Sequence, residues 1–79
     1  MKKEKLIKCP KLMAIAKKIK ELRIQKGYAS QESFAWKNNL DRVQYGRIEK
    51  GSNLTFKTFF MILNIHQMSP FEFFKDFDS

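Results

Sequence analysis

The sequence predicts an all-α protein, a compact domain of five short helices. Apolar residues recur at three- and four-residue steps, and paired helix-start and helix-stop residues follow one another closely along the chain. We find no β-hairpin dipeptide, no convincing strand alternation and no internal repeat. A chain of 79 residues can build one modest core, and no linker divides it. We expect a basic N-terminal leader at 1-10, the domain at 11-77 and a C-terminal end at 78-79.

The first helix follows the basic leader MKKEKLIKCP. Pro10 suits the entrance of a helix better than its interior, because proline lacks the backbone N–H that an interior position needs. Gly27 ends the helix, as a glycine in the left-handed region does. One apolar stripe is predicted, with lysines on the other faces: Leu12, Ile15, Ile19 and Leu22.

A second helix, SQESFAWKN, is expected with Ser30 as its N-cap. Phe34 and Ala35 are predicted to face inward, and the small Ala35 lets another helix approach closely. We expect Trp36 to be half exposed and assign it no role. Asn38–Asn39 breaks the pattern, and asparagine tolerates positive φ better than other non-glycine residues, so a turn is predicted there.

The third helix is predicted to open at Asp41, which forms with Gln44 a variant of the capping box, and to close at Gly51. Thr55 can cap a fourth helix, FKTFFMILNIH. The residues of this helix expected to share its inward face are Phe56, Phe59, Phe60 and Leu63.

The start of the fifth helix carries the densest signal in the chain. Ser69-Pro70-Phe71-Glu72 combines an N-cap serine, a first-turn proline and a glutamate at the third helical position. The helix is expected to be short and aromatic, over PFEFFKDF.

Charge limits the range of partners. The net charge is +8, from 16 Lys and Arg against 8 Asp and Glu. Such an excess favours DNA, RNA or an anionic membrane surface, although a merely solvated basic surface is the plainer reading. The single Cys9 cannot form an internal disulfide, and neither a signal-peptide run nor a membrane span is present in the sequence. We therefore expect a reduced, cytoplasmic protein.

The segment from Asp41 to Lys50 is the strongest functional candidate. Two short helices around a tight turn, with basic residues on the second, are typical of a helix-turn-helix, whose second helix enters the major groove of DNA. On a helical projection one side holds the positions 42, 43, 46, 47 and 50. Gly46 lies on that side and costs roughly 0.8–1 kcal/mol relative to alanine. Close approach to DNA would explain it; a glycine that the helix simply tolerates is the alternative.

An ordered series of residues extends this comparison to nearly the whole chain. The series lies in three segments of the chain, KIKELRIQKGYASQESFA, NLDRVQYGRIEKG and SPFEFF. Its residues are, in order, Arg23, Gly27, Ser30-Gln31-Glu32, Ala35 and Arg47-Ile48-Glu49-Lys50-Gly51. This series resembles the Cro/C1-type (XRE-type) helix-turn-helix family of phage repressors and small bacterial regulators, from about Leu12 to Phe74. The resemblance implies a lambda-repressor-like fold.

The resemblance also implies residue roles. Gln31 would bind a phosphate or the edge of the site, at a helix N-terminus that favours anions. Base reading would fall to Arg42, Val43 and Arg47, since arginine suits guanine and valine can touch a thymine methyl. Gln44 would read a base or hold a phosphate. The loop and helix-start residues Asn53, Thr55 and Lys57 would grip the DNA backbone, which sets affinity rather than sequence preference.

Arg23 and Glu49 have a structural role by the same resemblance. They match a partly buried salt bridge between the first and third helices. Arginine suits a bidentate pairing with a carboxylate.

Catalysis and metal binding find no support in the sequence. His66 and Cys9 are the only histidine and cysteine, too few for a zinc site that needs about four ligands. Asp76 and Asp78 are expected to be solvated charges of a polar tail. We expect no enzyme and no cofactor.

The expected function is a sequence-specific DNA-binding transcriptional regulator, a repressor by family habit. It would bind a pseudo-palindromic site in double-stranded DNA as a homodimer, through the aromatic cluster Phe71, Phe74 and Phe77. The alternative is an antitoxin-like or regulator-binding module that masks a protein partner with the same fold. An amphipathic binder of membranes is the weakest reading, because the helices are well punctuated.

Overall fold

The computed structural model describes residues 10–52, 54–75 and 77, and within them the predicted all-α architecture is confirmed. There are five helices: α1 (Pro10–Gln25), α2 (Gln31–Lys37), α3 (Arg42–Glu49), α4 (Phe56–Ile65) and α5 (Pro70–Phe74). The described residues contain no β-strand. The predicted leader, apart from Pro10, lies outside the described residues, as do Asp76, Asp78 and Ser79.

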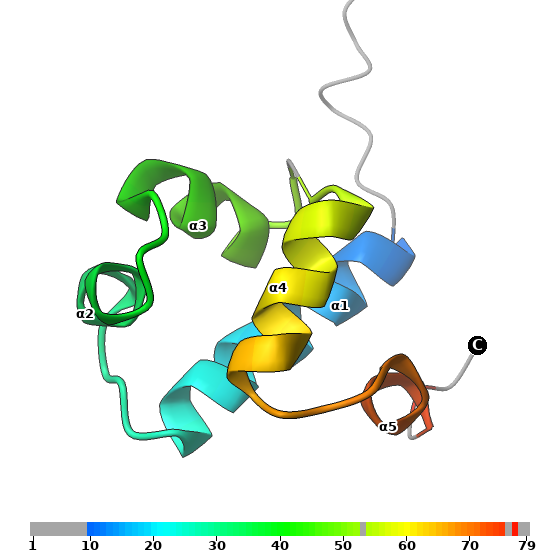
Figure 1. The fold of residues 1–79 in the computed structure, drawn as a ribbon. Helices are drawn as coiled ribbons and strands as arrows, with labels where there is room; N and C mark the ends of the chain where they lie inside the picture. Colours follow the sequence, from blue (N-terminus) through cyan, green and yellow to red (C-terminus); the bar gives the residue numbers. More distant parts are fainter. Residues whose placement is uncertain (1–9, 53, 76, 78–79) are drawn as a thin grey trace, which may run out of the picture.

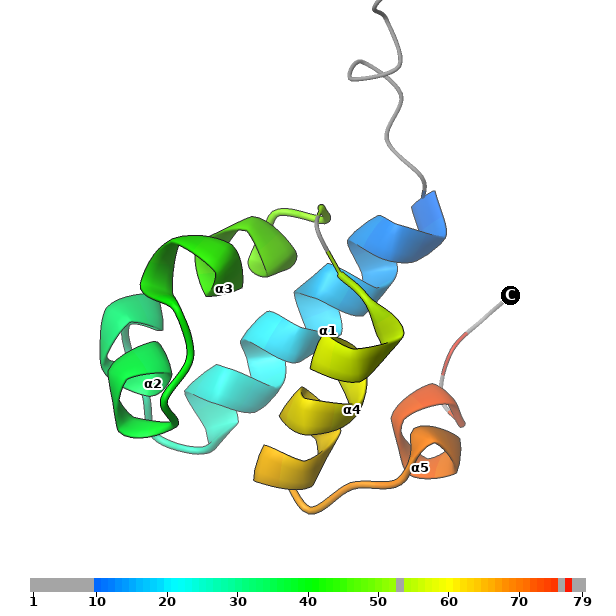
Figure 2. The same cartoon turned by 45° about the horizontal axis from the view of Figure 1, so that its top comes forward.

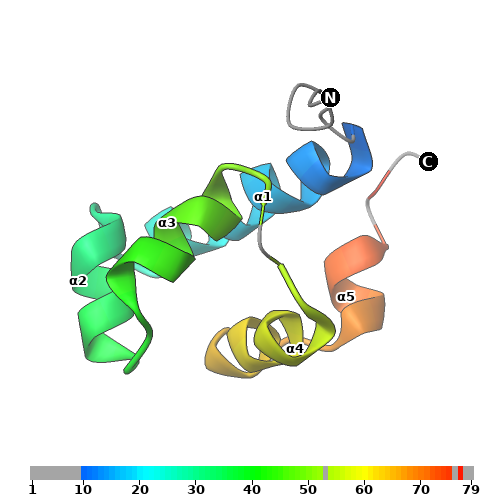
Figure 3. The same cartoon turned by 90° about the horizontal axis from the view of Figure 1, so that it is seen from above.

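The helices divide the molecule into two ends joined by a middle. In Figures 1, 2 and 3 the pair α2 and α3 stays at one end, and α5 stays at the other. The long α1 and α4 occupy the middle, and α2 and α3 pack on each other while α3 also packs on α1. Two separate surfaces follow from this layout, one formed by α2 and α3 and one by α4 and α5.

Side-chain caps begin four of the helices. The backbone N–H of Ser33 donates to the Ser30 hydroxyl at 3.0 Å, and that of Val43 donates to Asp41 Oδ1 at 2.8 Å. Thr55 caps α4, and Ser69 caps α5 in the full capping box with Glu72. Each cap satisfies backbone donors that have no partner inside the helix.

A residue with positive φ follows each of the first four helices. Gly27 has φ 105° and Gly51 has φ 93°, and Asn39 has φ 61° in the predicted turn between α2 and α3. Gln67, with φ 54°, follows α4 in the same way. The sequence did not predict this, because glutamine is not a residue type that favours positive φ. A Cβ atom at Gly51 would meet only the flexible end of the Met13 side chain, so it is the positive φ that favours glycine at this position.

The core lies where the five helices meet. Phe34 and Ala35 of α2 are fully buried, as predicted, and Phe34 packs on the ring of Tyr45 at 5.0 Å. The buried hydrophobic cluster consists of Ile19, Phe34, Ala35, Tyr45, Ile48, Phe59, Ile62, Leu63 and Phe73. Because every helix contributes at least one member, burial of this cluster holds the helices in their relative positions.

The predicted inward face of α4 was partly wrong. Phe59 and Leu63 are buried, but Phe56 is 81% exposed and Phe60 is 49% exposed, and Ile62 takes the inward position instead. The core is contacted along the stripe 59, 62 and 63, about 100° per residue, and the rings at 56 and 60 fall outside it.

Two smaller expectations also needed correction. Trp36 is 81% exposed rather than half exposed. The α5 helix ends at Phe74, earlier than the aromatic run suggested, and Phe77 packs against the core after the helix has ended. No described helix has the length and apolar character needed to cross a membrane.

Candidate nucleic-acid interface

One face of α3 is basic and open to solvent. Arg42, Arg47 and Lys50 are exposed, and Val43 is 53% exposed between them. On the opposite face Tyr45 and Ile48 are buried in the core. The helical projection therefore placed the two faces correctly.

A shallow hollow runs from this face onto α1 and α2. Lys20 of α1 and Glu32 of α2 contribute to its walls, in addition to the side chains of α3. The residues that line the hollow are Lys20, Arg23, Ala29, Gln31, Glu32, Arg42, Val43, Gly46, Arg47 and Lys50. Lys20 was absent from the predicted site, although it lies on the same helical face as Arg23, three residues earlier. A concave surface with this excess of cations attracts a polyanion.

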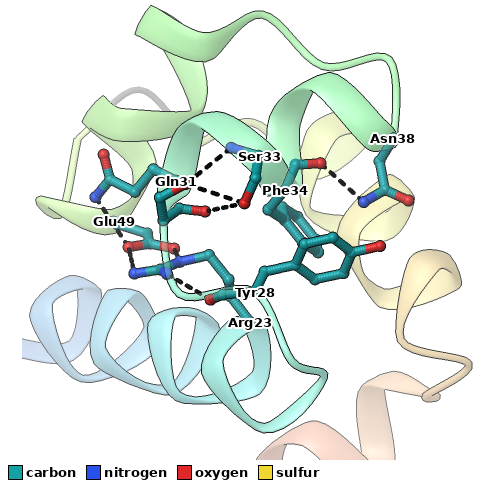
Figure 4. A network of polar contacts seen from close by, with 8 residues as sticks. Arg23, Tyr28, Gln31, Ser33, Phe34, Asn38 and Glu49 are labelled. Carbon is teal, nitrogen blue, oxygen red and sulfur yellow. Dashed lines mark hydrogen bonds and ion pairs between the residues drawn. The ribbon is translucent and has the colours of Figure 1, made fainter.

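Arg23, in the lining of the hollow, forms an ion pair with Glu49 that links α1 to α3 (Figure 4). Arg23 Nε donates to Glu49 Oε2 at 2.8 Å and Nη2 donates to Oε1 at 3.2 Å, the bidentate geometry expected of arginine. The two side chains are only 4% and 1% exposed. Arg23 Nη1 also donates to the carbonyl oxygen of Tyr28 at 2.8 Å, so the guanidinium ties the connection after α1 to the same network.

The carboxylate of Glu49 stays ionised at neutral pH. Burial by itself would raise its pKa, but the hydrogen bonds that it accepts, led by those of Arg23, outweigh desolvation and lower the pKa below its ordinary value. Arg23 in turn has a raised pKa, chiefly through its hydrogen bond to Glu49. Both partners therefore remain charged at neutral pH, where the pair is a fixed element of the interface.

Gln31 is the third member of this network. Its Nε2 donates to Glu49 Oε1 at 3.0 Å, which holds the first side chain of α2 against the last residue of α3 (Figure 4). The family resemblance implied a DNA contact for Gln31 but gave no sign of a link to Glu49. The link immobilises a side chain that otherwise has three free torsions.

Gly46 is the position where Gln31 meets α3. A Cβ atom added at Gly46 would lie 3.1 Å from Gln31 Oε1, tighter than an ordinary contact. The glycine therefore makes room within the protein, for the Gln31 amide. Close approach to DNA, the expectation from the sequence, is not required to explain it, but the two roles are compatible.

The other predicted contacts are distributed around this centre. Gln44 is exposed on α3, and Lys57 is exposed on the first turn of α4. The Thr55 hydroxyl accepts from the backbone N–H of Thr58 at 3.2 Å and donates to its hydroxyl at 3.1 Å, so its first role is to cap α4. Asn53 lies outside the described residues.

Helices α4 and α5 carry an exposed aromatic patch, defined here as Phe56, Phe60, Phe71 and Phe74. Phe71 is 77% exposed and Phe74 is 40% exposed. Ring contacts connect its two halves, because the buried Phe59 lies 5.9 Å from Phe60 and 5.8 Å from Phe74. Of the three predicted interface residues, Phe77 differs, since it is half buried against Phe73 and Phe74.

In the part of the chain that the structure describes, no three His, Cys, Asp or Glu side chains gather as metal ligands would. His66 instead stacks on Phe34, with ring centroids 5.5 Å apart and planes 9° apart. The histidine is thus a packing residue where α4 ends.

Comparison with known proteins relates the chain to solved structures of a DNA-bound regulator. No protein-family model matches the sequence, and no curated protein matches it significantly. Crystal structures of the restriction-modification controller protein C.Esp1396I do match. The wild type is 35% identical, with a TM-score of 0.72 over 86% of this chain and 88% of that one. A point mutant is 34% identical, with a TM-score of 0.73 over 87% of each chain. A tetramer in complex with its natural 35 base-pair operator is 35% identical, with a TM-score of 0.72 over 86% and 90%.

Proposed function

The chain belongs to the Cro/C1-type (XRE-type) helix-turn-helix family, and from this we propose that it is a sequence-specific transcriptional regulator that places α3 in the major groove of operator DNA. The observation that carries the proposal is the open basic face of α3, with Arg42, Val43 and Arg47 exposed around Gly46. The buried Tyr45 and Ile48 fix the rotation of α3, so this face is presented outward.

The proposed contacts divide by chemistry. Arg42 and Arg47 can each offer two donors to guanine O6 and N7, and Val43 offers a methyl group to thymine. Gln44 adds a base or phosphate contact. Lys57, Lys20 and Lys50 neutralise phosphates and set the salt dependence of binding. Together with contacts from Thr55 and Asn53, these contacts to the DNA backbone orient the protein but do not distinguish one base sequence from another.

We further propose that the active form is a homodimer that pairs through α5 and the adjoining part of α4. α5 lies at the end of the molecule away from α2 and α3, so a two-fold axis at α5 leaves both recognition helices free. Two such helices reach successive major grooves about 34 Å apart on a pseudo-palindromic site. The C.Esp1396I tetramer on its operator supports an oligomeric arrangement. Repression rather than activation, and control of restriction-modification genes as in that protein, are the finer proposals.

In this proposal the protein is not an enzyme and acts in the cytoplasm, where DNA is accessible. Selection of bound sequences from a random DNA pool tests it. We expect a reproducible two-fold motif and an affinity for it at least about a thousandfold above that for random DNA at physiological salt. A pool without enrichment, together with a stable protein partner that co-purifies, would favour the alternative of a module that masks another protein.

A further inference from the structure

The amide of Gln31 has an orientation that its partner dictates. An ionised carboxylate can only accept hydrogen bonds, so the group facing Glu49 Oε1 at 3.0 Å must be the amide nitrogen. The amide oxygen is therefore turned away from Glu49. It lies beside Gly46, where a Cβ atom would come within 3.1 Å of it.

This oxygen is a fixed acceptor on a surface of donors. Gln31 and Gly46 line the same hollow as the exposed Arg42 and Arg47. Guanidinium and ammonium groups donate hydrogen bonds and cannot accept them. Apart from the carboxylate of Glu32, the side chains of this hollow that reach solvent are cationic or apolar, so the Gln31 oxygen has a chemistry that the arginines cannot supply.

We propose that Gln31 Oε1 accepts a hydrogen bond from the exocyclic amino group of one base, cytosine N4 or adenine N6, and thereby specifies one base pair of the operator. These amino groups are the N–H donors that bases present in the major groove. Phosphate oxygens donate no hydrogen bond, so they cannot satisfy this atom. The proposal rests on the proposed function, because it requires α3 to lie in the major groove.

Gly46 is a positioning residue for this contact. Without a side chain at 46, the Gln31 amide oxygen has room beside α3 in the lining of the hollow. Glu49 holds the nitrogen end of the amide, and Arg23 holds Glu49 through two hydrogen bonds. The acceptor is thus preorganised, which reduces the entropy lost when DNA binds.

Three variants and a control test the proposal by selection from a random DNA pool. Gln31→Met keeps the length of the side chain and removes both amide groups. Gly46→Ala keeps the amide but displaces its oxygen. For both variants, we expect the preference for cytosine or adenine to fall about five- to tenfold at one base position, the same position in each half-site. The preferences at the other base positions should not change. The control Lys57→Ala is expected to weaken binding to every sequence alike. A third variant, Gln31→Glu, retains an acceptor but places a second carboxylate beside Glu49. The repulsion should displace it, so the preference at the same base position should be lost as well.

Methylated operators give the decisive comparison. N4-methylcytosine or N6-methyladenine at the affected position keeps the base pair but replaces the groove-facing N–H. The wild type should lose about five- to tenfold in affinity and Gln31→Met should lose nothing. An equal loss of affinity for methylated operators in the wild type and in Gln31→Met would overturn the inference. So would a loss of affinity of Gln31→Met for all sequences alike, with no base preference changed; Gln31 would then be a phosphate contact through its second N–H.

A wild type that enriches no motif would instead remove the proposed function, and this inference with it. Thermal unfolding of each variant, within a few degrees of the wild type, establishes that folded proteins are compared.

Discussion

At the residue scale, the ion pair between Arg23 and Glu49 fixes the positions of the side chains beneath the basic face of α3. Two charges with side chains 4% and 1% exposed give up most of their hydration, and the bidentate geometry compensates for it. Such a pair is weak evidence for net stability but a strong constraint, because neither charge tolerates the loss of its partner.

Glu49→Ala should therefore lower the free energy of unfolding by about 3–5 kcal/mol, since Arg23 stays buried without a counter-charge. Urea unfolding followed by circular dichroism measures the change. The double variant Arg23→Met/Glu49→Leu is the matched control and should recover most of the loss, because it leaves no buried charge. A double variant as unstable as Glu49→Ala would mean that the attraction itself, rather than the orphaned charge, is the larger contribution.

Arg47 and Lys57 separate base reading from phosphate binding. Arg47→Ala should cost roughly 1–3 kcal/mol on the cognate operator and relax one base position, because arginine on the open face of α3 is placed to read guanine. Lys57→Ala should weaken binding to all sequences and reduce the slope of log K against log salt by about one. Fluorescence anisotropy on cognate and random DNA at several salt concentrations distinguishes them. Equal losses for Arg47→Ala on both DNAs would count against base reading.

At the scale of single elements, α5 has only five residues and depends on how it begins. The Glu72 backbone N–H donates to the Ser69 hydroxyl at 3.1 Å, and the Ser69 backbone N–H donates to Glu72 Oε1 at 2.9 Å. So short a helix is not stable by itself. Its capping box and the buried ring of Phe73 are what hold it to the core.

Ser69→Ala is accordingly expected to lower the free energy of unfolding by about 1 kcal/mol, through loss of the N-cap acceptor. Chemical denaturation at fixed protein concentration measures this. Ser69→Asp is the control and should be as stable as the wild type, since aspartate caps helices as well as serine does. If Ser69→Ala and Ser69→Asp were equally destabilised, the hydroxyl would matter for something other than capping.

The packing of α2 against the end of α4 makes stability dependent on pH. His66 stacks on Phe34, and burial, followed by the nearby charge of Lys26, lowers its pKa below the ordinary 6.5. In the unfolded chain the imidazole takes up its proton more readily, so this contribution is fully present above about pH 6.5 and is lost as pH falls toward the folded-state pKa.

We therefore expect the thermal midpoint to drop as pH falls from about 7 to 5, and the replacement His66→Phe to flatten that part of the profile. Phenylalanine keeps the stacked ring and removes the titration. Below this range Glu49, with its lowered pKa, continues the loss in both proteins. Parallel profiles for the two proteins between pH 5 and 7 would show that His66 is not the group responsible.

At the scale of the whole molecule, two surfaces of opposite character lie on different helices. The basic face of α3 lies away from α5, and the aromatic patch exposes large rings on α4 and α5. Contiguous exposed apolar surface is uncommon on a monomer and is typical of an interface. The layout thus fits a molecule that pairs at one end and binds DNA at the other.

Phe71→Asp tests that arrangement. The ring is 77% exposed, so the monomer should stay folded, while a buried carboxylate at the interface should shift the protein toward monomer by at least tenfold in dissociation constant. Sedimentation equilibrium measures the change. Trp36→Asp is the matched control, because Trp36 is 81% exposed on α2, at the other end, and should leave the oligomeric state unchanged. A wild type that remains monomeric at high concentration would refute the dimer.

The amino-acid sequence by itself determined the number of helices, their starts and most of their ends. Those features depend on residues three or four positions apart, such as Ser69 with Glu72, or on single residues such as Gly27 and Asn39. The basic face of α3 was equally accessible, because it follows from helical period alone.

The tertiary structure decided what depends on how helices cross. The exposure of Phe56 and Phe60, the addition of Lys20 to the hollow, and the turned amide of Gln31 beside Gly46 all depend on how different helices meet. A local pattern states which face of a helix is apolar or charged. It does not state which neighbour that face meets, because the crossing angle results from packing the whole core at once.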